Sequence, residues 1–420
     1  MDLEGAFKVI DTPVHLPGRS DDALIRQLQQ QKAFSAPGKT LRPAAGLADG
    51  IALRPLEALH WLSYVTRPRY QDDVLDVYMR WGLLRYLGFF AHDYTHSRLP
   101  RLTLSEAGRR ISGNQRRVTS EEMGIAFGTA LAKRWFETTS AADLRTVVDI
   151  DVALDARYVF GPSSAVQHIG VQRPDYLLVG ADPDDSTRYL VRVLECKGTK
   201  NAGHAVPQLA RAVGQLDGVT VGGRVPHGLA TTVITAENNT SYLAVDPDDE
   251  EEPAYEVTAE TIDRVRNFRF EADRADASAV EIASASVRAS WAMLADFGSN
   301  LGALQQWAPE VMERRIVRRP RERLTFPAPV EEARGTSFTF GFDREQLTVS
   351  YGIARSVDDA LTERSAGAIM EAQRAFAARL RASPTPDEAD SRTVYSATAD
   401  GSIFSLTLER RGRDTFGAAG

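Results

Sequence analysis

The side chains best suited to metal-assisted chemistry are two carboxylates and a lysine at the ends of two apolar segments. Glu195 and Lys197 lie near the end of the run VRVLECKGTK, and Asp175 follows a proline upstream of it. Carboxylate oxygens are the ligands that Mg²⁺ and Mn²⁺ prefer. A divalent ion held there neutralises negative charge on a substrate and lowers the pKa of a bound water, and Lys197 adds a second positive charge. The lysine either orients that water or stabilises the transition state, and the sequence leaves both roles open.

These side chains meet only if their two segments pair as a β-hairpin. If Asp175 lies opposite Glu195, the chain reverses at Asp185, inside the turn-rich stretch ADPDDST. Side chains alternate along a strand, so Asp175, Glu195 and Lys197 then share one face of the hairpin. Cys196 points to the opposite, buried face, as expected of a small apolar residue.

Further elements are predicted on both sides of the hairpin. The segment RVTSEEMGIAFGTALAKRWF has apolar residues at helical spacing, with Thr119 or Ser120 as its N-cap. The segment HAVPQLARAVGQL reads as a helix that opens near Pro207 and carries Gln208 and Gln215 on one side. DLRTVVDIDVALDARYV and GLATTVITA are rich in β-formers. The predicted order is helix, three strands, helix, strand.

This order and the Pro-Asp and Glu-x-Lys motifs resemble the PD-(D/E)xK nuclease superfamily over residues 119–245. The resemblance implies an α/β, restriction-endonuclease-like fold, in which helices flank a mixed central sheet. It implies Mg²⁺ or Mn²⁺ as cofactor, held by Asp175, Glu195 and the carbonyl of Cys196. The catalytic residues that it implies are Glu122, or failing that Glu121, on the first helix, then Asp175, Glu195, Lys197 and Gln208.

A second segment, residues 46–116, resembles a winged helix. Two helices are predicted over residues 55–65 and 71–87, followed by a polar wing. The stretch Leu104-Ser105-Glu106-Ala107-Gly108 is similar to the Leu-Thr-x-x-Gly pattern that closes such domains. Winged helices place one helix in the major groove of DNA, although some serve only protein contacts. The arginines expected to meet phosphates are Arg80, Arg85, Arg98, Arg101, Arg109 and Arg110.

Composition limits the protein class. The chain has 420 residues, a net charge of -7 and one cysteine. Its length suggests several domains, and a single cysteine excludes an intramolecular disulfide. The first residues lack the layout of a signal peptide, and no apolar run is long enough to span a bilayer. We therefore expect a cytoplasmic protein.

The predicted domains differ in composition. They are an N-terminal extension (1–45), the winged helix (46–116), the nuclease domain with trailing helices (117–310) and a C-terminal α/β domain of unknown role (324–420). The acidic run 246–253 reads as a solvated loop. The basic run MERRIVRRPRER reads as either a linker or a phosphate-contacting arm. A helix near 358–382 and a hairpin turn at 399–401 are expected in the last domain.

These observations predict a Mg²⁺-dependent endodeoxyribonuclease that acts on duplex DNA. The resemblance alone suggests restriction or another defence against foreign DNA, with a possible partner protein of a defence system. A homodimer is expected, because a chain with one active site can cut both DNA strands only as a pair of chains or by acting twice. The alternatives are a non-catalytic DNA-binding regulator on a nuclease-like scaffold and an RNA-processing or DNA-repair nuclease.

Overall fold

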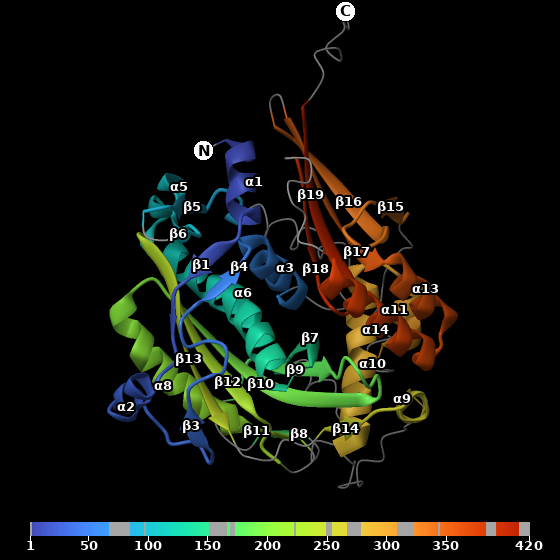
Figure 1. Ribbon diagram of the computed structural model, residues 1–420, viewed down its shortest axis with the longest axis horizontal. Coiled ribbons are helices and arrows are strands. Elements are labelled where there is room, and N and C mark those ends of the chain that lie inside the picture. The colour runs from blue at the N-terminus through green and yellow to red at the C-terminus, as the bar shows by residue number, and fades with distance from the viewer. Residues whose placement is uncertain are drawn as a thin grey trace, which may run out of the picture.

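The computed structural model describes residues 2–66, 85–95, 98–140, 142–150, 166–168, 173–221, 224–248, 254–266, 279–308, 322–342, 345–383 and 392–410. Within them the chain is a mixed α/β protein, whose mixed and antiparallel sheets are flanked by helices (Figure 1). Most of the helix expected over residues 71–87, including Arg80, lies outside the described residues.

One mixed sheet carries the predicted motif. Its strands, in spatial order, are β2 (Gly18–Arg19), β13 (Asn239–Asp248), β12 (Gly228–Ala236), β10 (Arg188–Thr199), β9 (Tyr176–Ala181) and β7 (Asp143–Asp149), with β3 (Thr40–Arg42) on β13 and β14 (Tyr255–Glu256) on β10. β7, β9 and β10 are antiparallel neighbours, whereas β12 runs parallel to β10. The predicted hairpin and its register are confirmed, because Tyr176 pairs with Leu194 and this places Asp175 beside Glu195.

Two helical segments cover opposite faces of this sheet. α6 (Gly113–Ser140) packs on one face, where its Gly128 lies next to Cys196. α8 (Ala205–Gln215) follows the short helix η1 (Ala202–His204) and continues into η2 (Leu216–Gly218). On this second face Leu216 and Val193 both lie within about 3 Å of the position that a Cβ on Gly228 would take, and Val193 shares its side of β10 with Glu195. A small antiparallel pair joins β8 (Val166–His168), which precedes β9 in the chain, to β11 (Val219–Val221), which follows η2.

The start of α6 differs from the prediction. The helix begins at Gly113 rather than at Thr119 or Ser120. The hydroxyls of these two residues donate to main-chain carbonyls four residues earlier, those of Gln115 and Arg116, within the helix. Ser and Thr form such bonds inside helices as well as at caps, so the capping signal was wrong about the boundary.

The first quarter of the chain forms a smaller sheet. Its strands, in spatial order, are β4 (Ile51–Leu53), β1 (Val14–Leu16), β6 (Arg101–Leu104) and β5 (Phe90–Asp93). Its helices are α1 (Leu3–Asp11), α3 (Pro55–Val65) and α5 (Glu106–Arg109), while α2 (Asp22–Gln29) packs on α8. The expected helix over residues 55–65 is therefore present, and the β5–β6 hairpin lies at the expected wing. Residues 1–45 do not stand apart as an extension, because they supply β1 to this sheet and β2 and β3 to the large one.

The C-terminal unit is an antiparallel sheet with two helices. Its strands, in spatial order, are β15 (Leu324–Phe326), β16 (Ala333–Phe342), β17 (Glu345–Ala354), β19 (Ser402–Arg410) and β18 (Thr393–Ala397). The single helix expected near 358–382 is two helices, α13 (Arg355–Glu363) and α14 (Ala366–Ala382). Arg364 separates them with a φ of 63°, and Ser365 caps α14. The predicted turn joins β18 to β19, where Gly401 has a φ of 98°.

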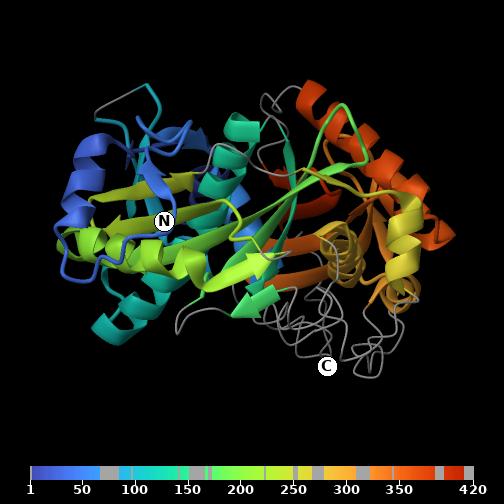
Figure 2. The same cartoon turned by 90° about the horizontal axis from the view of Figure 1, so that it is seen from below.

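Three helices and a set of buried polar contacts join the two large units. α9 (Ala259–Arg266), α10 (Ala279–Phe297) and α11 (Leu301–Trp307) follow the large sheet, and α10 lies between β7 and β17 (Figures 1 and 2). The buried Arg145 of β7 donates to the carbonyls of Gln373, at 2.9 Å, and Ala399. Asp143 of the same strand pairs with Arg381 of α14. The C-terminal unit therefore closes the β7 edge of the large sheet.

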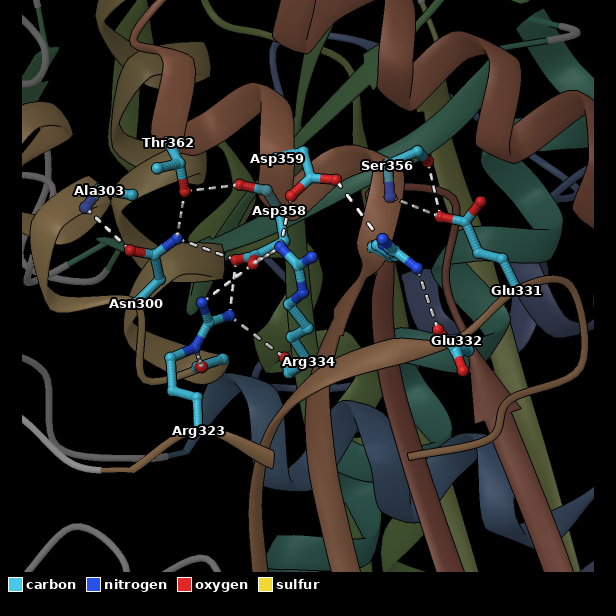
Figure 3. Close-up of polar contacts among 12 residues, drawn as sticks. Asn300, Ala303, Arg323, Glu331, Glu332, Arg334, Ser356, Asp358, Asp359 and Thr362 are labelled. Carbon is cyan, nitrogen blue, oxygen red and sulfur yellow. Dashed lines mark hydrogen bonds and ion pairs between the residues drawn. The ribbon is translucent and has the colours of Figure 1, made fainter. Parts of the chain in front are cut away.

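Arg323, at the end of the basic run, belongs to a polar cluster (Figure 3). Its guanidinium donates to both carboxylate oxygens of Asp358, at 2.6 and 2.9 Å, and to the Gly298 carbonyl at 2.9 Å. Asn300 donates to the same buried carboxylate at 2.9 Å. Arg323 thus ties the end of α10 to α13 and is not a phosphate-contacting arm. The other arginines of the run lie outside the described residues.

The acidic run begins inside a strand rather than in a solvated loop. Asp246 lies in β13, is buried, and accepts a hydrogen bond of 2.8 Å from the indole nitrogen of Trp135. This bond ties α6 to β13, which explains why an acidic side chain is buried there. Residues 249–253 lie outside the described residues. None of the described helices combines the length and the apolar character that a membrane crossing needs.

Candidate metal-dependent active site

The hairpin brings the three predicted motif residues together. Lys197 Nζ contacts Glu195 Oε1 and lies 3.9 Å from Asp175 Oδ2. Asp175 Oδ2 also accepts a hydrogen bond of 3.0 Å from the Cys196 amide. This bond connects the start of β9 to the centre of the motif on β10. Asp175, Glu195 and Lys197 therefore form one cluster on the face of the sheet that α8 covers.

Burial dominates the electrostatics of this cluster. The Glu195 side chain is 0% exposed, and burial, followed by the nearby charge of Asp175, raises its pKa to about 8. Burial also raises the pKa of Asp175, although Lys197 and the Cys196 amide oppose the shift. For Lys197, burial lowers the pKa, but the two carboxylates outweigh it and the net shift is upward. One ammonium faces two carboxyls, of which Glu195 is fully buried and Asp175 partly exposed, so the carboxyl groups of the cluster outnumber its positive charges.

The donor set fits a hard divalent cation. Apart from the contact with Lys197 and the interaction with the neighbouring Asp175 carboxyl, the buried Glu195 oxygens have no hydrogen-bond partner within the described residues. Buried acceptors of this kind are normally satisfied, and a divalent cation is one partner that carboxylate oxygens accept. In the same part of the chain, no group of three or more His, Cys, Asp or Glu side chains gathers closely enough to hold a metal ion. Mg²⁺ commonly completes such a site with water and phosphate oxygens.

Glycines let α6 approach the motif strand at backbone distance. A Cβ on Gly198 would lie 1.7 Å from the Ser120 carbonyl oxygen, and one on Gly124 would lie 2.7 Å from the Lys197 carbonyl carbon. A Cβ on Gly128 would lie 2.7 Å from Cys196 Sγ. Real Cβ atoms do not tolerate such distances, so these positions require glycine. We call this close contact, made at Gly124, Gly128 and Gly198, the glycine seam. The sequence analysis did not predict it, although Gly124 and Gly128 are one helical turn apart and Gly198 follows the motif lysine.

The structure separates the two candidate helix acids. Glu122 accepts hydrogen bonds from Arg85 Nη1, at 2.9 and 3.1 Å, and from the Tyr86 hydroxyl. It therefore holds the 85–89 segment to α6 and does not join the motif cluster. Glu121 is exposed, and its Cα lies 3.0 Å from the Cβ position of Gly198. Of the two, Glu121 is the acid that the glycine seam brings beside the motif strand.

The two glutamines of α8 have different surroundings. Gln208 lies in the first turn of the helix, as predicted, and its Oε1 is buried without a hydrogen bond among the described residues. No contact in that part of the chain joins it to Asp175, Glu195 or Lys197. Gln215 donates from Nε2 to the Arg173 carbonyl at 3.1 Å. It anchors the segment that leads into Asp175, a positioning role that the sequence reading did not assign.

The arginines proposed for phosphate contact also differ in availability. Arg85 is paired with Glu122, and Arg110 is paired with Glu106 one turn earlier. Arg98 and Arg109 are exposed beside the β5–β6 hairpin, and neither makes an ion pair within the described chain. Arg101 is half-buried on β6. The number of free cations near the expected wing is therefore smaller than the sequence alone suggested.

We compared the chain with known protein families, curated proteins and solved structures. No family model matches the chain, and neither a curated protein nor a solved structure matches it.

Proposed function

We propose that this protein hydrolyses phosphodiester bonds of duplex DNA with a bound divalent metal ion, Mg²⁺ or Mn²⁺. The observation that carries the proposal is the cluster of Asp175, Glu195 and Lys197, in which a buried carboxyl, a partly exposed carboxyl and one ammonium meet at adjacent strand ends. Apart from short helices and the separate β8–β11 pair, the element order is α6, β7, β9, β10, α8, β12, which supports a restriction-endonuclease-like core because it is the order expected from the resemblance.

The residues divide the chemical work between them. Asp175, Glu195 and the carbonyl of Cys196 hold the cation, which supplies charge neutralisation and an acidified water when bound. Lys197 places its ammonium next to that position, where it orients the water or stabilises the developing charge on phosphate. Glu121, from the other face of the strand end, is the acid proposed to complete the site. Gln215 fixes the backbone before Asp175.

The proposed substrate is a nucleic acid with an exposed phosphate backbone. Exposed arginines beside the β5–β6 hairpin, Arg98 and Arg109, favour contact with a phosphate backbone. A homodimer with two sites accounts for cleavage of both strands. We propose restriction or another defence against foreign DNA as the role, on the strength of the resemblance alone. An RNA-processing or DNA-repair nuclease shares the same metal site.

Plasmid cleavage tests the catalytic proposal directly. The purified protein is incubated with supercoiled and linear duplex DNA in the presence of Mg²⁺, Mn²⁺ or a chelator. Asp175→Ala, Glu195→Ala and Lys197→Ala are each expected to abolish cleavage while keeping a native circular dichroism spectrum. Asp184→Ala, in the exposed turn of the same hairpin, is the matched control and is expected to cut normally. Undiminished cutting by all three motif variants contradicts the proposal.

A panel of substrates separates the alternatives. Preference for duplex DNA over single-stranded DNA, structured RNA and modified DNA supports the deoxyribonuclease reading, whereas preference for RNA supports the processing enzyme. Tight binding of duplex DNA with no cleavage under any metal condition supports the regulator, which uses the nuclease-like core only as a scaffold.

A further inference from the structure

A buried threonine lies beside the motif lysine on the next strand. β10 and β12 run parallel, and their register places Thr232 level with Lys197. Residues in register on neighbouring strands share a face, and the strands lie about 5 Å apart. Thr232 is 0% exposed, and its hydroxyl oxygen has no hydrogen-bond partner among the described residues. A hydroxyl with unused bonding capacity is therefore next to the Lys197 side chain.

Metal binding would deprive the Lys197 ammonium of its present hydrogen-bond acceptors. In the structure its ammonium contacts Glu195 and lies near Asp175, the two carboxylates proposed to hold the cation. An ammonium and a divalent cation repel each other at such distances, and both compete for the same oxygens. The ammonium, on a side chain that is 29% exposed, then needs another hydrogen-bond acceptor, because a partly buried charge without hydrogen bonds is costly.

We propose that Thr232 is this acceptor: its hydroxyl receives the Lys197 ammonium when Asp175 and Glu195 take up a divalent cation. Thr232 is thus a positioning residue that frees Glu195 for the metal and holds the lysine beside the reacting phosphate. The inference rests on the proposed function, because it presupposes the metal site.

Metal affinity, measured without substrate, tests this role. Mn²⁺ and Mg²⁺ dissociation constants are obtained by calorimetry and by the rise in unfolding temperature with added ion. Thr232→Val keeps the side-chain shape but removes the hydroxyl, and it is expected to weaken binding about 10-fold or more, the range for a lost hydrogen bond to a charged group. Thr232→Ser restores the hydroxyl and is expected to restore affinity.

Two controls separate this role from a general effect on folding. Thr240 is also 0% exposed with an unpartnered hydroxyl in the described chain, but it pairs with Thr235, away from the motif. Thr240→Val is therefore expected to bind metal like the wild type. In a Lys197→Met background, Thr232→Val is expected to have no further effect, because the group that it receives is gone.

The outcomes distinguish the inference from the proposed function. Unchanged metal affinity in Thr232→Val, or an equal loss in the Lys197→Met background, overturns the role of Thr232 and assigns the lysine to another acceptor, such as Gln208. Absence of any divalent-ion binding by the wild-type protein overturns the metal site itself, and with it the proposed function.

Discussion

Replacing Glu195 with glutamine is expected to stabilise the metal-free protein, and increasingly so as the pH rises. The reason is the pKa of the Glu195 carboxyl, which burial raises from 4.5 to about 8 in the folded protein. Between these two values the folded state binds a proton that the unfolded state has released. The free energy of unfolding therefore falls as the pH rises from about 4.5 to about 8, and is constant above that range. Glutamine has no such proton to lose.

The size of this change in the free energy of unfolding follows from the pKa shift of Glu195. Each pKa unit corresponds to about 1.4 kcal/mol, so the full penalty above the folded pKa is about 4 to 5 kcal/mol. Glu195 titrates together with Asp175 and Lys197, so part of this energy belongs to the group as a whole. We expect Glu195→Gln to gain at least about 2 kcal/mol over the wild type at about pH 9, and much less at about pH 5.

The measurement is urea unfolding followed by tryptophan fluorescence, in a chelator, at a series of pH values. Glu260→Gln is the control, because this side chain is 83% exposed on α9. Its unfolding curve should keep the pH dependence of the wild type. Added Mg²⁺ should reverse the order, since the wild type gains stability from binding and the variant does not. A wild type and a Glu195→Gln variant with the same pH dependence would refute the reasoning.

Three further predictions address the surroundings of the site. Gly198→Ala should push α6 off the motif strand and cost about 1 to 3 kcal/mol with loss of cleavage, whereas Gly203→Ala in the short helix η1 should not; urea unfolding and plasmid cleavage measure both. Glu121→Gln should impair cleavage with little change in stability, while Glu122→Gln should cost about 1 to 3 kcal/mol and keep cleavage; the reverse pattern would restore Glu122 as the helix acid. Arg145→Met should cost about 3 kcal/mol and expose the C-terminal unit to limited proteolysis, and an unchanged cleavage pattern would contradict its role.

Local patterns in the sequence determined the part of the fold that carries the motif. Alternating apolar residues and the turn-rich stretch ADPDDST fixed the β9–β10 hairpin, and its observed register places Asp175 opposite Glu195 as predicted. The β12 strand and the α3 helix also have the predicted bounds. These elements were predictable because their signals depend on neighbouring residues, and a one-residue slip would turn every buried side chain of a strand to the wrong face.

Only the tertiary structure decided how distant segments meet. The parallel pairing of β1 with β6, the glycine contacts that set α6 on β10, and the partnership of Glu122 with Tyr86 join residues far apart in the chain. No local periodicity encodes such pairings. The shifted pKa of Glu195 is also a tertiary property, because it depends on burial and on a second carboxyl from another strand. The sequence supplied the chemical groups and their spacing, whereas non-local packing determined their burial, their charge balance and which acid stands beside them.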